Sequence, residues 1–161
     1  MESACLQLLL NNTEETEAFG AMLWQALPSK CLVFLDGELG AGKTTLIRGL
    51  LRAAGFQQVV RSPTYSLVEE YDLADRRLFH FDLYRLKDPE ELEWLGMNDY
   101  LQQTALCFIE WPQMGAGFLP AADLEIRLHY QADARLLEIK VLAEKLKKSL
   151  QLNWKNKEIV C

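Results

Sequence analysis

Apolar residues are arranged along the chain in two ways that predict strands. The segments 31–36 (CLVFLD) and 105–110 (ALCFIE) are nearly continuous apolar runs, which is typical of strands buried on both faces. Residues 123–143 alternate between apolar and polar positions and predict a hairpin that turns near 132–133. Residues 5–10 (CLQLLL) form a candidate first strand.

Apolar residues at helical spacing mark three other segments. Residues 11–28 predict a helix with acidic residues in its first turn, where the helix dipole favours them. Residues 43–55 predict a second helix that ends at a glycine. Residues 88–101 predict a third, in which Asp88 is the cap and Glu91 its capping-box partner.

Two segments between the second and third helices predict extended strands, 64–73 and 76–86, joined by a short polar turn. The second segment contains LFHFDLYRL, whose letters alternate. One side carries Phe79, Phe81 and Leu83, and the other carries His80, Asp82 and Tyr84. Because the second side is less apolar, we expect this strand to be buried on one face only, with Asp82 near a sheet face or rim.

Composition narrows the possible classes of protein. The chain of 161 residues has a formal net charge of −6, so the basic surface typical of autonomous nucleic-acid binding is not expected. Its four cysteines form no C-x-x-C pair, which favours reduced thiols in a cytosolic protein over zinc or disulfides. There is no signal-peptide pattern and no apolar run of membrane-spanning length, so we expect a cytoplasmic protein without membrane contact.

The sequence GELGAGKT, residues 37–44, fits the pattern G-x-x-x-x-G-K-S/T between an apolar strand and a helix. Glycines let the backbone turn tightly and direct amide groups at phosphate oxygens. Lys43 supplies a cation for the β and γ phosphates, and the Thr44 hydroxyl is an oxygen ligand for Mg²⁺. We therefore predict a nucleoside triphosphate site formed by Gly37, Glu38, Leu39, Gly40, Ala41, Gly42, Lys43, Thr44 and Thr45.

ATP, with ADP as its product, is favoured over GTP. GTP-binding members of the P-loop class carry N-K-x-D and D-x-x-G motifs. Residues 156–159 read NKEI, without the aspartate, and no D-x-x-G occurs.

A P-loop site also needs a carboxylate near the metal, usually at the end of a buried strand beside the loop. Glu110 follows four apolar residues and is the better Walker B-like candidate, whereas Asp82 lies on the alternating strand. The two need not compete, since one can hold Mg²⁺ through water while the other orders the attacking water or a switch segment. A solvated surface position remains the alternative for each.

Several other residues are candidates, each with a plainer alternative. The loop RSPTYS, 61–66, carries the Ser62 and Thr64 hydroxyls where a switch loop is expected, or is an ordinary turn. Trp111 can stack on a base or a partner, or pack at the rim of the core. Arg135 can reach a phosphate, or be a solvated turn residue.

The stretches DGELGAGKTTLIRG, RSPTYSLVEEY, HFDLYRL and IEWP occur in this order between about residues 31 and 120. In this combination the chain resembles the TsaE (YjeE) family of bacterial ATPases. The resemblance implies a P-loop NTPase-like α/β fold of three layers with a mixed parallel/antiparallel sheet. We place a single P-loop ATPase domain at 1–142 and a C-terminal helix and tail at 143–161.

The resemblance also implies a function. Proteins of this family bind and hydrolyse ATP with Mg²⁺ and reset the TsaB–TsaD pair, which makes threonylcarbamoyladenosine at position 37 of tRNA; contact with tRNA is only indirect. By motif, Lys43 matches the phosphate residue, Thr64 a switch threonine and Glu110 the metal-linked acid. Thr44 matches the Mg²⁺ residue, Asp82 matches the acid of HFDLYR, and Trp111 matches the tryptophan that follows the acid of IEW. Thr13 and Arg135 match, more weakly, positions that border the nucleotide.

Two other functions stay open at this point. The first is a small P-loop kinase of a metabolite, against which the chain shows no arginine-bearing lid. The second is a nucleotide-sensing module that does not hydrolyse ATP.

Overall fold

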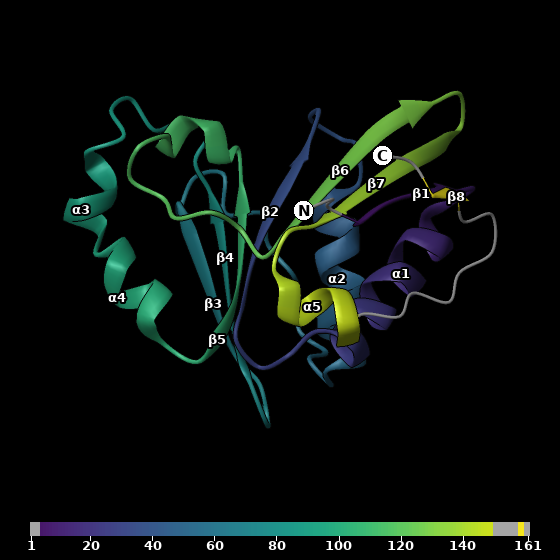
Figure 1. Ribbon diagram of the computed structural model, residues 1–161, viewed down its shortest axis with the longest axis horizontal. Helices are drawn as coiled ribbons and strands as arrows, with labels where there is room; N and C mark the ends of the chain where they lie inside the picture. Colours follow the sequence, from purple (N-terminus) through teal and green to yellow (C-terminus); the bar gives the residue numbers. More distant parts are fainter. Residues whose placement is uncertain (1–3, 150–157, 160–161) are drawn as a thin grey trace.

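The computed structural model describes residues 4–149 and 158–159. In this part of the chain, eight strands form one sheet in the order β3-β4-β5-β2-β6-β7-β1-β8 (Figure 1). The strands are β1 (Ala4–Leu10), β2 (Cys31–Gly37), β3 (Val68–Asp72), β4 (Arg77–Asp82), β5 (Ala105–Glu110), β6 (Leu124–Gln131), β7 (Ala134–Val141) and β8 (Glu158–Ile159). The helices are α1 (Thr13–Ala26), α2 (Lys43–Ala53), α3 (Glu91–Leu95), α4 (Met97–Gln102), the 3₁₀ turn η1 (Pro112–Gly115) and α5 (Glu144–Ser149).

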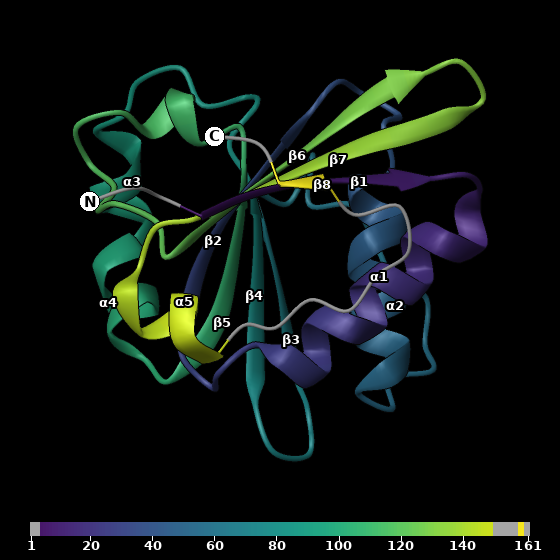
Figure 2. The same cartoon turned by 45° about the vertical axis from the view of Figure 1, so that its right-hand side comes forward.

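The sheet is mixed. Strands β4, β5, β2 and β6 are parallel to their neighbours in the centre, whereas β3, β7, β1 and β8 pair antiparallel. Helices α1 and α2 lie on one side of the sheet and α3 and α4 on the other (Figures 1 and 2). The expected α/β fold with a mixed sheet is confirmed.

Two hydrophobic cores fill the space between these layers. The first joins α1 and α2 to the sheet and includes Phe19, Ile47 and Phe108. The second lies under α3 and α4 and includes Phe79 and Phe81. Successive residues of a strand point to opposite faces, so β4 and β5 contribute alternate residues to the two cores.

The expectation that β4 is buried on one face only is wrong. Every residue from Leu78 to Asp82 is buried, because β4 lies between β3 and β5 and both of its faces are covered. The alternation itself is real, since Phe79 and Phe81 face α3 and α4. The polar side carries His80 and Asp82 and is buried on the side of α2.

The boundaries of several elements differ from expectation. The strand expected over 64–73 begins only at Val68, because residues 63–66 form a turn and Leu67 has a φ of 71°. The helix expected over 88–101 is split at Gly96, whose φ of 81° ends α3 before α4 begins. A carboxylate oxygen of Glu91 accepts the Asp88 N–H at 3.3 Å, so that capping contact forms although α3 starts later.

The hairpin at the end of the sheet is confirmed as β6–β7, with Ala132 in the left-handed region at a φ of 52°. The segment after residue 142 contains α5 and also β8, which pairs with β1. The boundary between a domain at 1–142 and a C-terminal helix and tail at 143–161 stays a prediction. Residues 150–157 and 160–161, which include part of the expected tail, lie outside the described residues.

Helices α1 and α2 approach each other closely at two glycines. A Cβ atom at Gly49 of α2 would lie 2.0 Å from the Glu17 carbonyl oxygen, and one at Gly20 of α1 would lie 2.1 Å from the Leu46 carbonyl oxygen. No real Cβ atom tolerates such a distance from backbone, so the two helices require glycine at both positions. This contact fixes α2, whose first residue follows the phosphate loop, against the rest of the fold.

Two cysteines are buried in the sheet, and their thiols are predicted to be unreactive. Burial raises the pKa of Cys31 and of Cys107 from 9.0 to about 12. A rise of about three units lowers the thiolate fraction at pH 8 roughly a thousandfold. We expect neither thiol to react with a thiol reagent at pH 8 in the folded protein, and both to react in denaturant, as mass spectrometry would show. Labelling of either without unfolding would contradict the burial described here.

Among the described residues, no helix combines the length and the apolar character needed to cross a membrane.

Candidate functional site

The phosphate loop connects β2 to α2 at the carboxyl edge of the central strands. Gly40 and Gly42 have φ values of 79° and 109°, in the left-handed region that favours glycine. Gly42 caps α2, and Lys43 and Thr44 are its first two residues. The amide groups at the start of this helix therefore border the loop, which is the arrangement that binds phosphate in P-loop proteins.

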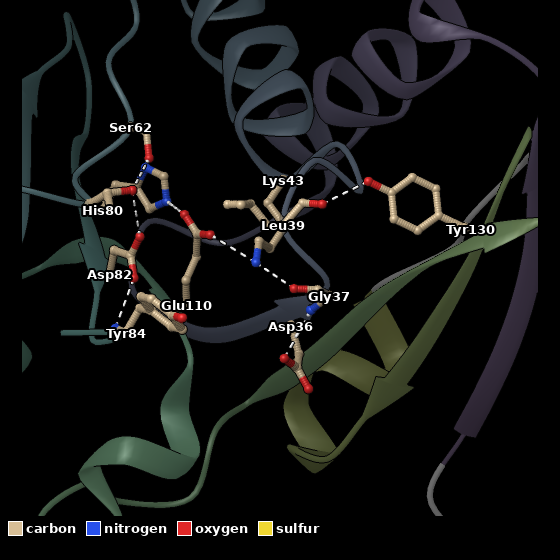
Figure 3. A network of polar contacts seen from close by, with 11 residues as sticks. Asp36, Gly37, Leu39, Lys43, Ser62, His80, Asp82, Tyr84, Glu110 and Tyr130 are labelled. Carbon is tan, nitrogen blue, oxygen red and sulfur yellow. Dashed lines mark hydrogen bonds and ion pairs between the residues drawn. The ribbon is translucent and has the colours of Figure 1, made fainter. Parts of the chain in front are cut away.

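Lys43 is almost completely buried, at 6% exposure. Its ammonium donates a hydrogen bond to the Gly37 carbonyl and lies 3.4 Å from a carboxylate oxygen of Glu110 (Figure 3). The ring of Trp111 lies 5.0 Å from the same ammonium. The cation predicted to bind phosphate is thus held by groups of the chain itself, directly beneath the loop.

The two candidate carboxylates lie side by side. Asp82 and Glu110 are register partners at the carboxyl ends of β4 and β5, and their exposures are 4% and 3%. Both face the side of the sheet that carries α2. Asp82 therefore lies at a strand end beside Glu110 and on the same face of the sheet, and both side chains are buried.

Each oxygen of the Glu110 carboxylate has a contact. Oε1 faces the Lys43 ammonium at 3.4 Å, and Oε2 lies 2.6 Å from Nε2 of His80, which is fully buried (Figure 3). A buried carboxylate is costly unless it is paired and hydrogen-bonded. The two contacts orient the Glu110 carboxylate at the end of β5.

Asp82 is held in a different way. Its Oδ1 accepts the Tyr84 N–H at 2.9 Å, and its Oδ2 accepts the Thr64 hydroxyl at 3.0 Å. The Thr64 and Ser62 hydroxyl oxygens lie 2.8 Å apart in turn (Figure 3). Asp82 therefore connects the end of β4 to the turn at 63–66.

A cavity of about 360 Å³ lies on the other side of the phosphate loop. Thr13 and Arg135 line it together with Thr45, Gly40 and Gly42. The two residues whose sequence match was weakest are therefore brought to one cavity beside the loop, between the start of α1 and the β6–β7 turn.

The tip of the phosphate loop is held from the hairpin. The Tyr130 hydroxyl donates to the Leu39 carbonyl at 2.7 Å (Figure 3). The Arg135 guanidinium lies over the Tyr130 ring at 4.3 Å. The Leu39 side chain itself is 85% exposed. Glu38 is exposed as well, so these two loop positions border the site through their backbone.

Sequence reasoning missed two residues of this network. The sequence analysis assigned His80 no role at the site, although its position two residues before Asp82 on the same face of the strand was a usable signal. Tyr130 had no signal, because only the pairing of β6 with β7 and β2 brings it to the loop. Trp111 does contact the site, through Lys43 and through a tilted stack with Tyr84 at 4.9 Å.

Among the described residues, no group of three or more His, Cys, Asp or Glu side chains could hold a metal ion by itself. The oxygen-bearing groups of the site include the carboxylates of Asp82 and Glu110, the Thr64 hydroxyl beside Asp82, and Thr44 at the start of α2. A cation bound here would therefore need oxygens from outside the chain as well.

An apolar parallel strand, a glycine-rich loop ending in Lys-Thr and a helix directly behind it define a P-loop protein of the α/β class. The model of the family described as "Threonylcarbamoyl adenosine biosynthesis protein TsaE" matches residues 10–137. The chain belongs to the TsaE family.

Individual relatives support the same family assignment. The tRNA threonylcarbamoyladenosine biosynthesis protein TsaE of Haemophilus influenzae is 54% identical over 108 residues, which are 67% of this chain and 68% of the relative. The protein of the same name from Bacillus subtilis is 34% identical over 122 residues, 76% of each chain. The crystal structure of Bacillus subtilis YdiB superposes with a TM-score of 0.79 at 25% identity and covers 92% of this chain and 93% of that one.

Proposed function

We propose that this chain is a Mg²⁺-dependent ATPase that acts in the biosynthesis of tRNA threonylcarbamoyladenosine by binding and resetting the TsaB–TsaD pair. The place in this pathway is supported by the family and by the names of its relatives. ATP hydrolysis and the TsaB–TsaD pair are the further steps of the proposal. The observation that carries them is the polar network that joins the phosphate loop to two buried carboxylates and a hydroxyl-bearing turn.

The Lys43 contacts are what a triphosphate would replace. In the structure the ammonium binds Gly37 and Glu110, both of which are acceptors of the chain. A β or γ phosphate cradled by the loop amides presents a stronger acceptor and draws Lys43 toward it. Glu110 then loses one of its two contacts, and its Oε1 becomes available to a water molecule at the terminal phosphate.

Mg²⁺ fits the donor set, because the available groups are hard oxygens. Thr44 would supply a hydroxyl directly, and the carboxylates of Asp82 and Glu110 would hold water molecules of the ion's shell, since each carboxylate already accepts from the chain. When bound, the ion neutralises charge on the phosphates. The chain's own contribution is to place these oxygens at one edge of the sheet.

Thr64 is the proposed switch. Its hydroxyl donates to Asp82. A change in the position or contacts of the Asp82 carboxylate therefore alters the turn at 63–66. We propose that the ATP-bound state orders this turn in a conformation that binds the partner pair, and that hydrolysis releases it. A switch of this kind requires different affinities for the partner in the two nucleotide states.

The test measures binding to the TsaB–TsaD pair with a non-hydrolysable ATP analogue and with ADP. We expect at least about a tenfold tighter complex with the analogue, which corresponds to ~1.4 kcal/mol. Thr64→Val should remove this difference, because it deletes the donor to Asp82. Ser66→Ala is the matched control, since it removes a hydroxyl of the same turn that bonds Glu69 and not Asp82. Equal affinities of the unmodified protein would contradict the switch.

The two alternative functions give other results in the same assays. A metabolite kinase would transfer phosphate to a small acceptor without TsaB–TsaD. A module that only senses nucleotide would show the affinity difference but release no phosphate. Phosphate release that depends on the partner pair supports the ATPase.

A further inference from the structure

His80 is the most deeply buried polar side chain of the site, and the proposed mechanism gives it no role so far. It lies on β4 opposite Phe108 of β5 and is 0% exposed. Its one polar contact in the described part of the chain is to Oε2 of Glu110, at 2.6 Å. A histidine that served only to fill the core could be an apolar residue, and would not then need a buried polar partner.

The geometry of this contact is directional. A carboxylate can only accept hydrogen bonds, so the contact requires the form of His80 in which Nε2 carries the hydrogen. The register places His80 two residues before Asp82, whose partner is Glu110, so the imidazole reaches the carboxylate diagonally from behind the end of the strand. From there it leaves the opposite oxygen, Oε1, turned toward Lys43 and the phosphate loop (Figure 3).

We propose that His80 is a positioning residue for Glu110: its Nε2–H fixes the carboxylate so that Oε1 stays directed at the phosphate loop when Lys43 moves to the nucleotide. Without this donor, a carboxylate that had lost Lys43 would have no hydrogen bond on either oxygen from residues 4–149 or 158–159, and its side chain would be free to rotate. This inference rests on the proposed ATPase function, in which Glu110 acts on the terminal phosphate.

His80→Leu and His80→Gln separate positioning from packing. Leucine fills the space but donates no hydrogen bond, whereas the glutamine amide can place an N–H near the position of Nε2. We expect kcat for partner-dependent ATP hydrolysis to fall about 10- to 100-fold in His80→Leu, the range for losing a hydrogen bond to a charged group. We expect His80→Gln to stay within about threefold of the unmodified rate, and the affinity for ATP to stay within about twofold in both variants, since the loop amides are unchanged.

Phe108→Leu is the matched packing control. It replaces the register partner of His80, which is equally buried and lies on the same face, but removes no donor from Glu110. Phe108→Leu should lower thermal stability and leave kcat within about twofold. The positioning role is overturned if His80→Leu keeps the unmodified kcat, if His80→Gln falls as far as His80→Leu, or if Phe108→Leu loses as much kcat.

Crystal structures of the two His80 variants with a non-hydrolysable ATP analogue bound, the state in which Lys43 is proposed to leave Glu110, decide the inference even if no hydrolysis is found. The Glu110 carboxylate should keep its orientation in His80→Gln and leave it in His80→Leu. An unchanged carboxylate in His80→Leu overturns the positioning role. Absence of hydrolysis by the unmodified protein with TsaB–TsaD would instead overturn the proposed function.

Discussion

Replacing Glu110 with glutamine is expected to lower partner-dependent ATP hydrolysis by about a hundredfold or more, while nucleotide binding persists. Glutamine keeps the size of the side chain but removes its charge. Because Oε1 and Oε2 each face a nitrogen group, the glutamine NH₂ must face either Lys43, which can only donate, or His80, which must then change tautomer to accept. The variant therefore loses both the charge and the orientation of the group proposed to act at the terminal phosphate.

ATP binding by the Glu110→Gln variant should change much less than hydrolysis. The loop amides and the start of α2 remain, and Lys43 is released from an acceptor that holds it away from the nucleotide. We expect ATP affinity within about fivefold of the unmodified protein by calorimetry, since the amides and the helix terminus carry phosphate recognition. Phosphate release is measured in parallel, with TsaB–TsaD present and with ATP saturating.

Glu138→Gln is the control for Glu110→Gln. Glu138 also lies near a histidine, with 3.4 Å between its carboxylate and His129, but this pair of the β6–β7 hairpin is partly exposed, at 46% and 39% of the two side chains. The same chemical change there should leave hydrolysis within about twofold, because exposed ion pairs contribute little. Unmodified hydrolysis in Glu110→Gln would remove Glu110 from the mechanism and leave Asp82 as the carboxylate to test.

The sequence predicted those parts of the site that depend on local pattern. The phosphate loop follows from residues 37–44, and Glu110 follows from an apolar run that ends in a carboxylate. Each of these features depends only on one buried parallel strand and on the residues at its carboxyl end. The mixed sheet was an expectation from the family resemblance, whereas the order of strands and helices in the first two thirds of the chain indicates only the α/β class.

The burial of β4 could not be predicted in that way. A strand with His80 and Asp82 on one face resembles a half-solvated strand, because polar groups are usually exposed. Here their burial is offset by partners from distant segments: Thr64 for Asp82, and Glu110 for His80. Only the sheet order and the register bring these partners together, and no local pattern encodes either.

Replacing Gly49 with alanine is expected to lower the free energy of unfolding by about 3 kcal/mol, the upper end of the usual cost of overpacking. Alanine is the better helix former by about 1 kcal/mol, so in a helix without a close neighbour the same change would stabilise. The opposite sign follows from the added Cβ atom, which would lie 2.0 Å from the Glu17 carbonyl oxygen and must push α1 and α2 apart.

Chemical denaturation measures this loss, and Arg48→Ala is its control. Arg48 neighbours Gly49 in the sequence and pairs with Glu17 at 3.5 Å across the same helices, but the pair is partly exposed, so its loss should cost within about 0.5 kcal/mol. A Gly49→Ala protein as stable as the original would show that α1 and α2 separate without cost. Since α2 carries Lys43 and Thr44 at its start, the same displacement should also weaken ATP binding. A Gly49→Ala protein that loses stability but binds ATP with unchanged affinity would show that the phosphate loop is positioned by β2 alone.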